Sequence, residues 1–336
     1  MSKPSKKVLV VYAGGTIGMV DSELGYRPDE GFVGVLQQAL VEHGVQGVEV
    51  VALASLIDSS NAGVGDWQAM IEALEDYAKS YSALVLLHGT DTLAYSAAVL
   101  ALWFEGRGCA LVITGAQRTF VSEDSDALEN VLGAIAYAQR ADFQQVAVYF
   151  GGLLLNPYAV RKVHAQDDRA FATPNAPIWG ETYALFAKAM VRMPRLALGK
   201  ERCLSTVGQG AVALCHITPS MPEAVISACF SESVQAVVLC SYGVGNVPQR
   251  EDLQQGMAKL LARGGLVLHC TQCFQGYTQQ NVYATGVGAL GGIEGGLMHY
   301  ELAYVLAYFA CAFNWQAQEV ADWVAHYNRI LHNAGK

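Results

Sequence analysis

Hydrophobic residues fall along the chain in two alternating patterns, short continuous runs and longer stretches with helical spacing. Val8 to Val11 is an apolar run typical of a buried strand, whereas Trp67, Met70 and Leu74 recur at the spacing of one helix face. The same patterns predict strands at 48–53, 83–87, 110–114 and 146–150, and helices at 32–43, 93–104 and 128–139. Strands that alternate with helices build parallel βαβ units, so residues 1–190 are predicted to form a larger N-terminal domain with a mostly parallel sheet.

A break in this periodicity divides the chain. The stretch from Ala189 to Gly210 holds proline, several glycines and scattered charges without a sustained period, which predicts a linker at 191–210. Beyond it the alternation resumes, with strands at 211–216, 236–240 and 266–270 and helices at 223–229, 253–261, 302–313 and 317–331. The predicted fold class is therefore α/β, with residues 211–336 forming a smaller C-terminal α/β domain.

Composition narrows the class of protein. The chain has 336 residues, 52% of them hydrophobic and 15% charged, which is enough for two domains with substantial cores and argues against disorder. The formal net charge is −9, and the basic residues do not cluster. A phosphate backbone attracts basic patches, so we expect no nucleic acid partner.

The distribution of apolar residues also bears on location. The run at Val8 is too short for the apolar part of a signal peptide, and the stretch 302–313 is shorter than the roughly 20 residues of a membrane span. The eight cysteines lie mostly inside apolar runs, as free thiols do in a reducing compartment. Cys270 and Cys273 have the spacing of half a zinc site or of a redox pair, but no second such pair lies nearby. We expect a cytoplasmic protein with no membrane association and no metal.

The first segment with candidate chemistry follows the first strand. Gly14-Gly15-Thr16 places a hydroxyl after two residues that can adopt positive φ, so the turn can expose the hydroxyl and bring backbone N–H groups close to a ligand. A dinucleotide-binding loop is a weaker interpretation because the GxGxxG spacing is absent. A plain turn or helix cap is the structural alternative for Thr16.

The second segment, from His88 to Thr92, follows the strand at 83–87. Asp91 offers a carboxylate for an amine, and Thr90 offers a hydroxyl that can relay a proton. Either residue can also cap the helix that starts near Leu93, and both roles are compatible. The sequence contains no GxSxG and no HExxH, so neither a serine hydrolase nor a zinc protease is indicated.

Together these two threonine segments resemble the bacterial-type L-asparaginase family, and the chain is most similar to its cytoplasmic, type I branch. The resemblance covers nearly the whole chain. Its further matches are Asp58-Ser59-Ser60, Ile113 to Gln117, Arg161 to Ala165, Ser241 to Asn246, Thr271 to Cys273 and Tyr283 to Gly286.

The resemblance implies roles for particular residues. Thr16 would attack the side-chain amide of L-asparagine, assisted by Tyr26. Thr90, Asp91 and Lys162 would move protons between the nucleophile, the leaving ammonia and water. Without the resemblance, the sequence would indicate only a surface lysine at Lys162, in the loop 156–169. Family members often carry threonine before this lysine, whereas this chain has Arg161 there, which adds a cation beside it.

Substrate binding follows from the same resemblance. Ser59 and Ser60 would hold the α-carboxylate of asparagine, and Asp91 its α-ammonium group. Asn246 and Glu301 would complete the site from the C-terminal domain of a neighbouring subunit, which requires a homodimer or homotetramer. The reaction needs no metal or organic cofactor.

Three alternatives remain open. A glutaminase-leaning amidohydrolase would carry the same catalytic residues, since one methylene in a pocket discriminates weakly. The archaeal amidotransferase subunit that shares these motifs usually has an additional N-terminal module, whereas the nucleophile strand here begins by Val8. The third alternative, a catalytically silent asparagine sensor, is a binding protein and not an enzyme.

Type I enzymes can also carry an effector site, and Cys273 lies in the segment that resembles it.

Overall fold

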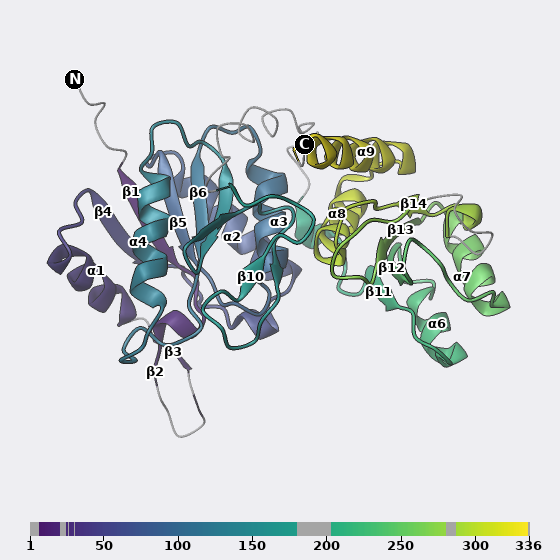
Figure 1. Ribbon diagram of the computed structural model, residues 1–336, viewed down its shortest axis with the longest axis horizontal. Coiled ribbons are helices and arrows are strands. Elements are labelled where there is room, and N and C mark those ends of the chain that lie inside the picture. Colours follow the sequence, from purple (N-terminus) through teal and green to yellow (C-terminus); the bar gives the residue numbers. More distant parts are fainter. Residues whose placement is uncertain are drawn as a thin grey trace. The chain divides into compact units, whose positions relative to one another are not determined.

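The apolar runs of the N-terminal half form one six-stranded sheet in the computed structural model of the chain (Figure 1). Its order is β4-β1-β5-β6-β7-β8, and only β8 runs antiparallel to its neighbour. The strands are β1 (Val8–Tyr12), β4 (Val48–Ala52), β5 (Ala83–Leu87), β6 (Ala110–Thr114), β7 (Val146–Phe150) and β8 (Leu153–Leu155). The mostly parallel sheet predicted for this half is confirmed.

The structure describes residues 7–20, 25, 27–29, 31–179, 203–279 and 287–334. The chain divides into two compact units, Met1–Thr173 with Pro177–Val191, and Pro174–Ala176 with Arg192–Lys336. The linker predicted at 191–210 lies mostly outside the described residues. We call the two parts the N-terminal unit and the C-terminal unit and describe each by itself.

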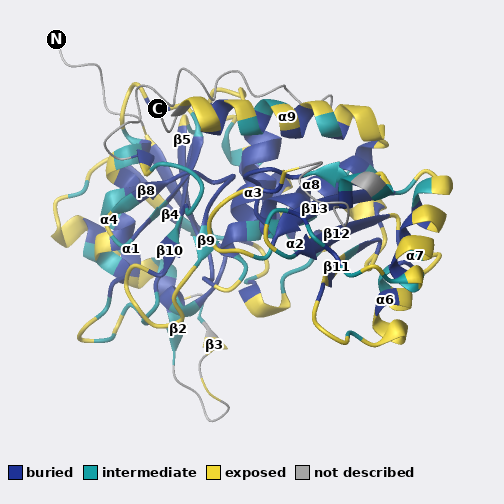
Figure 2. Cartoon of the chain, turned by 45° about the vertical axis from the view of Figure 1, so that its right-hand side comes forward, coloured by how far each residue is buried: buried dark blue, intermediate teal, exposed yellow. Residues whose placement is uncertain are grey.

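Helices cover both faces of the N-terminal sheet. They are α1 (Phe32–Glu42), α2 (Val64–Tyr77), α3 (Leu93–Phe104) and α4 (Ala127–Ala138). In Figures 1 and 2, α4 lies on one face, while α2 and α3 lie together on the other. The sequence of α3 is apolar on every side, and nearly all its residues are buried, whereas α2 and α4 bury one stripe each (Figure 2).

Short elements mark the ends of the parallel strands. A 3-10 turn, η1 (Thr16–Gly18), follows β1, and another, η2 (Ser59–Asn61), precedes α2. Two antiparallel pairs lie outside the main sheet, β2 (Met19–Val20) with β3 (Arg27–Pro28), and β9 (Arg161–Lys162) with β10 (Phe171–Ala172). These two-residue strands are too short for a periodic sequence signal, and the sequence did not predict them.

The C-terminal unit contains a second, four-stranded parallel sheet in the order β11-β12-β13-β14. Its strands are β11 (Val212–His216), β12 (Ala236–Ser241), β13 (Leu266–Thr271) and β14 (Ile293–Glu294). Its helices are α6 (Glu223–Cys229), α7 (Glu251–Ala262), α8 (Tyr300–Phe313) and α9 (Ala317–Ala334), with the 3-10 turns η3 (Leu204–Thr206) and η4 (Val287–Leu290). The α/β class is thus confirmed for both units.

Two further expectations concern cysteines and membranes. The eight cysteines are free thiols, with Cys270 buried in β13 and Cys273 exposed just beyond it. Among the helices that the structure describes, none is long and apolar enough to cross a lipid bilayer.

Candidate active site

The turn after β1, which carries Thr16, packs against two other loops. Gly14 and Gly15 have φ values of 120° and 91°, which favour glycine. A Cβ on Gly14 would overlap the backbone of Ile57, and a Cβ on Gly15 would overlap the backbone of Gly89. Thr16 is half-buried, whereas its neighbours Gly15 and Ile17 are buried. Of these three residues, only Thr16 is therefore partly accessible to solvent.

The loop after β5 packs against this turn and against the loop before α2. A Cβ on Gly89 would overlap the side chain of Ser59. The Asp91 backbone N–H donates to Ser59 Oγ at 3.3 Å, and Thr92 Oγ1 donates to the Ser59 carbonyl at 2.8 Å. Three loops that are far apart in sequence therefore meet at the carboxyl ends of β1, β4 and β5, where open α/β sheets bind ligands.

His88 stabilises the loop after β5 by a buried hydrogen bond. Its side chain is buried, and its Nδ1 donates a hydrogen bond to the Gly89 carbonyl at 2.7 Å, because a carbonyl can only accept. Burial lowers the pKa of His88, which keeps the imidazole neutral. His88 therefore fixes the peptide that leads into Thr90.

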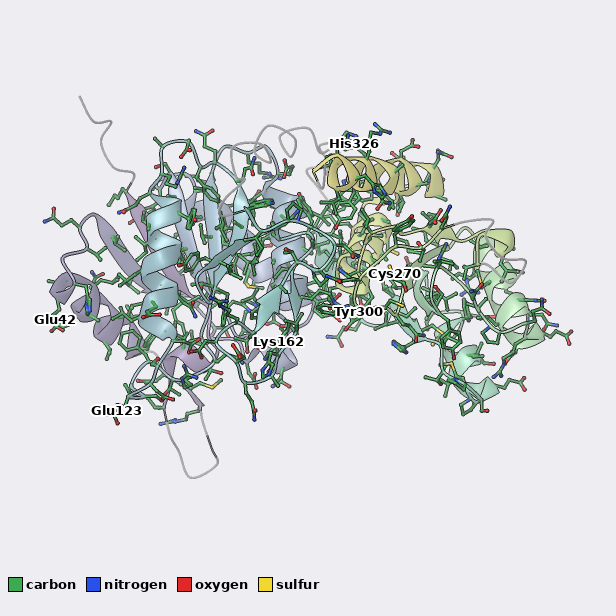
Figure 3. The ribbon with its side chains drawn as sticks, viewed as in Figure 1. Glu42, Glu123, Lys162, Cys270, Tyr300 and His326 are labelled. Carbon is green, nitrogen blue, oxygen red and sulfur yellow. The ribbon has the colours of Figure 1, made fainter. Side chains whose placement is uncertain are left out.

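Lys162 joins the second loop from the β9–β10 hairpin. Its Nζ donates to Thr90 Oγ1 at 2.8 Å and lies 2.8 Å from Asp91 Oδ1. The lysine side chain is 24% exposed, whereas that of Asp91 is 60% exposed, so solvent screens this ion pair in part. Lys162 (Figure 3) is not a surface lysine in an irregular loop, since it lies in β9 and its amine is directed at two oxygens.

The predicted carboxylate-binding serines lie in η2. Asp58 caps this turn, with Oδ1 accepting from the Ser60 backbone N–H at 3.1 Å and Oδ2 from the Asn61 side chain at 3.0 Å. Ser59 is buried, whereas Ser60 is exposed. Within the N-terminal unit the structure thus gathers the Thr16 turn, Ser59, Ser60, Thr90, Asp91 and Lys162.

The other predicted residues are placed differently. Tyr26 lies outside the described residues. Asn246 belongs to the C-terminal unit, where its backbone forms an isolated β-bridge with Tyr242. Glu301 lies in the first turn of α8 and is 6% exposed. Arg161 pairs across the hairpin with Ala172, and its side chain is half-buried.

Sequence reasoning missed the close approach of Gly89 to both Gly15 and Ser59. A glycine two residues after the end of a buried strand is the one local signal of such an approach, and it does not identify the partner. The site therefore places the Lys162 amine within hydrogen-bond distance of the Thr90 hydroxyl and the Asp91 carboxylate. Among the described residues, no set of three or more histidine, cysteine or acidic side chains is placed to hold a metal ion.

Known proteins share this architecture. The family model described as asparaginase, N-terminal matches residues 7–191, and the model described as glutaminase/asparaginase C-terminal domain matches residues 211–324. L-asparaginase 1 of Escherichia coli K12 is 31% identical over 298 residues, which span 86% of this chain and 88% of that protein. The 60 kDa lysophospholipase of Mus musculus is 28% identical over 312 residues, which span 86% of this chain and 55% of that protein.

Comparison of structures gives the same grouping. The crystal structure of L-asparaginase I from Vibrio cholerae superimposes with a TM-score of 0.78 at 25% sequence identity, covering 95% of this chain and 97% of that chain. The N-terminal family model alone spans more than half of this chain. With the threonine loops, Lys162 and both sheets in place, the chain belongs to the asparaginase family.

Proposed function

We propose that the chain is an L-asparagine amidohydrolase, which converts L-asparagine to L-aspartate and ammonia with Thr16 as the nucleophile. The main support for the proposal is that the Lys162 amine contacts both the Thr90 hydroxyl and the Asp91 carboxylate. These two groups lie on the loop that packs against the Thr16 turn. The names of the Escherichia coli and Vibrio cholerae relatives support asparagine as the substrate.

The proposed reaction is a double displacement. The Thr16 hydroxyl oxygen adds to the side-chain amide carbon, and backbone N–H groups hold the oxyanion that forms. The carbon–nitrogen bond then breaks, and the proton from Thr16 leaves with the amine as part of ammonia. Water adds to the resulting aspartyl ester, aspartate departs, and a proton returns to the Thr16 oxygen. No metal or organic cofactor enters these steps.

Thr90 has the geometry for moving these protons. Its Oγ1 accepts a hydrogen bond from Lys162, so its own proton remains available to donate. Such a hydroxyl can accept from one side and donate to the other without a net change in charge. In this proposal Tyr26 assists Thr16 during the attack.

The same proposal assigns substrate binding. Ser59 and Ser60 hold the α-carboxylate, and Asp91, more exposed than Lys162, meets the α-ammonium group. Asn246 of the partner subunit and Glu301 of the partner subunit complete the site, so the active form is a homodimer or homotetramer. The protein acts in the cytoplasm.

The decisive experiment is ammonia release from L-asparagine, L-glutamine and D-asparagine by the wild type and by Thr16→Ala. Thr206→Ala, which removes an exposed threonine of η3, is the matched control. We expect release from L-asparagine that Thr16→Ala abolishes and Thr206→Ala leaves unchanged. A burst of ammonia before steady state would report the aspartyl ester.

The alternatives give distinct outcomes. Faster release from L-glutamine than from L-asparagine would identify a glutaminase-leaning enzyme with the same nucleophile. A folded wild type that binds L-asparagine by calorimetry but releases no ammonia would be a sensor, and the hydrolase proposal would be wrong.

A further inference from the structure

Lys162 lies on a hairpin that is too small to hold its amine in place. The β9 and β10 strands have two residues each, with pairing of Lys162 to Phe171 and of Arg161 to Ala172. Of the connecting residues 163–170, all but the buried Ala170 are exposed. Because a hairpin of this length is not stable in isolation, contacts outside the hairpin must fix the position of Lys162.

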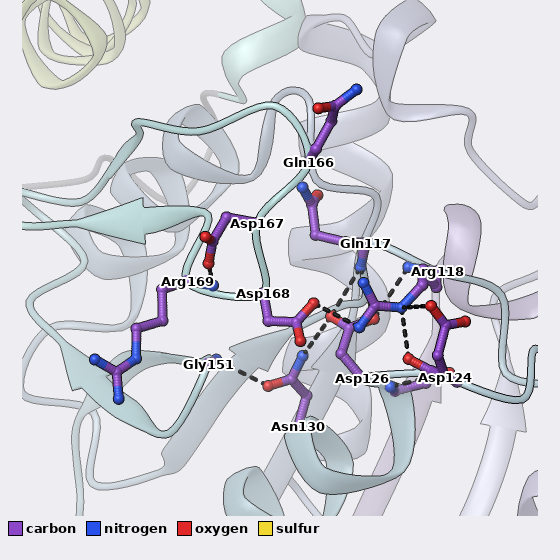
Figure 4. Close-up of polar contacts among 12 residues, drawn as sticks. Gln117, Arg118, Asp124, Asp126, Asn130, Gly151, Gln166, Asp167, Asp168 and Arg169 are labelled. Carbon is purple, nitrogen blue, oxygen red and sulfur yellow. Dashed lines mark hydrogen bonds and ion pairs between the residues drawn. The ribbon is translucent and has the colours of Figure 1, made fainter.

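Two side chains from the loop after β6 supply such contacts. Gln117 Nε2 donates to the Ala165 carbonyl at 2.9 Å, and Arg118 Nη2 lies 2.6 Å from Asp168 Oδ1. Arg118 Nε also donates to the Asp124 carbonyl at 2.6 Å, which holds the guanidinium between the two loops (Figure 4). The connecting loop is therefore held near its start and near its end.

Asp126 fixes the loop that carries these two side chains. Its carboxylate accepts the backbone N–H of Gln117 at 2.9 Å and that of Arg118 at 3.0 Å, and the residue is 7% exposed. Asn130 Nδ2 donates to Asp126 Oδ2 and to the Gly115 carbonyl, both at 3.1 Å (Figure 4). A buried carboxylate with this many donors gives the loop a rigid base.

The same loop also supports Thr90. A Cβ on Gly115 would overlap the carbonyl of His88 and would lie 3.7 Å from Thr90 Cγ2. The loop thus contacts the segment of Thr90 through Gly115 and the hairpin of Lys162 through Gln117 and Arg118. The two partners of the 2.8 Å hydrogen bond thus lie on segments that both contact this loop.

We propose that Gln117 and Arg118 are positioning residues that hold the Lys162 amine within hydrogen-bond distance of Thr90 and Asp91. Among the described residues, neither side chain hydrogen-bonds Thr90, Asp91 or Lys162, so the two act through Ala165 and Asp168 on the hairpin. The catalytic consequence rests on the proposed function, whereas the position of Lys162 can be tested without it.

The first test measures the reactivity of Lys162 itself. Wild type, the double variant Gln117→Ala/Arg118→Ala and Arg140→Ala are reductively methylated, and modification of Lys162 is followed by peptide mass spectrometry. Arg140 is the matched control because it forms an exposed ion pair with Asp142 at 2.9 Å within one loop. We expect Lys162 to react roughly three- to tenfold faster in the double variant, the factor for one ordinary hydrogen bond lost, and unchanged in Arg140→Ala.

The second test measures catalysis of L-asparagine hydrolysis. In the double variant we expect kcat to fall by roughly ten- to a hundredfold because misplaced groups lose reactivity, with little change in KM. Arg118→Lys, which keeps a cation facing Asp168, should recover much of kcat when Gln117 is retained. A purely structural role would instead lower the melting temperature and leave kcat per folded molecule unchanged.

The outcomes separate the two proposals. Unchanged Lys162 labelling in the double variant would overturn the positioning role, whatever the activity. A wild type without amide hydrolysis would overturn the proposed function, and the labelling would still decide the role of Gln117 and Arg118. If the double variant does not fold, Asp168→Asn removes the exposed partner of Arg118 alone, and the same labelling decides the question with it.

Discussion

The Lys162 amine lies 2.8 Å from the Thr90 hydroxyl, although 72 residues separate the two positions in the chain. The contact joins a hairpin outside the main sheet to the loop that follows β5. Because Asp91 lies at the same distance from this amine, one cation faces both a hydroxyl and a carboxylate. That arrangement underlies the first prediction.

Replacement of Lys162 should remove proton transfer and leave the fold intact. We expect Lys162→Met to lower kcat for L-asparagine by roughly 10²- to 10⁴-fold, the usual contribution of a positioned acid–base group. Lys162→Arg should also lose most activity, since a planar guanidinium cannot reproduce the geometry of an ammonium group. Steady-state ammonia release measures both. Lys79→Met, which removes an exposed lysine paired with Asp76 at 2.9 Å, should behave as wild type.

The close contact between Gly15 and Gly89 supports a second prediction. Gly15→Ala adds a methyl group that overlaps the Gly89 backbone and imposes a strained φ of 91° on alanine. We expect a loss of roughly 1–3 kcal/mol in the free energy of unfolding, together with loss of activity, because the Thr16 turn must move. Urea unfolding and ammonia release measure the two effects.

Gly34→Ala is the matched control for that variant. Gly34 lies in the exposed part of α1, and an added Cβ there meets nothing within 4 Å. Alanine is the better helix former, so this variant should gain about 0.5–1 kcal/mol and keep full activity. Equal behaviour of the two alanine variants would contradict the importance of the Gly15 contact.

Much of the fold could be predicted from local sequence patterns. The strand at Ala83–Leu87 and the helix at Leu93–Phe104 have the predicted bounds, because continuous apolar runs between turn signals report burial directly. The two threonine loops could be located for the same reason, since each follows such a strand. Here local pattern and tertiary structure agree.

The remaining features depend on long-range contacts that leave no local pattern. Lys162 occupies a two-residue strand whose existence depends on pairing with Phe171. Asn175 belongs with the C-terminal unit because its side chain hydrogen-bonds Gly276 and Leu297, more than 100 residues away. Neither position shows a periodicity that could identify such partners, so sequence reasoning missed both contacts.

A third prediction concerns His269, which lies in β13 and is 1% exposed. Neither ring nitrogen hydrogen-bonds another of the described residues, and burial lowers its pKa from 6.5 to about 4. Between these values the unfolded chain binds a proton that the folded chain does not. Stability is therefore complete above pH 6.5 and falls as the pH drops toward 4, by on the order of 3 kcal/mol.

His269→Met should remove this pH dependence. We expect the melting temperature of the variant to fall less than that of the wild type between pH 7.5 and pH 5. His216→Met, which removes an exposed histidine of β11, controls for loss of an imidazole as such. Parallel curves for His269→Met and the wild type would show that another group titrates.

The final prediction concerns a pair of cysteines in the C-terminal unit. Cys229, at the end of α6, packs against the buried Cys215 of β11, and its interaction with the Cys215 thiol lowers the pKa of Cys229 to about 7. The same interaction, together with burial, raises the pKa of Cys215. Because the thiolate is the nucleophile, alkylation of the half-buried Cys229 by iodoacetamide should rise steeply through pH 7.

Substitution of Cys215 tests the cause of that reactivity. Cys215→Ala removes the donor, so the alkylation profile of Cys229 should move to higher pH, whereas Cys215→Ser keeps a hydroxyl donor and should hold the profile near its original position. Peptide mass spectrometry distinguishes Cys229 from the exposed Cys273 in the same sample. Identical profiles in the alanine and serine variants would mean that Cys215 does not set the pKa of Cys229. A shift confined to the alanine variant would assign the ionised thiol to Cys229. A hydrogen-bond donor at position 215 stabilises the thiolate that accepts from it, and only the alanine variant lacks that donor.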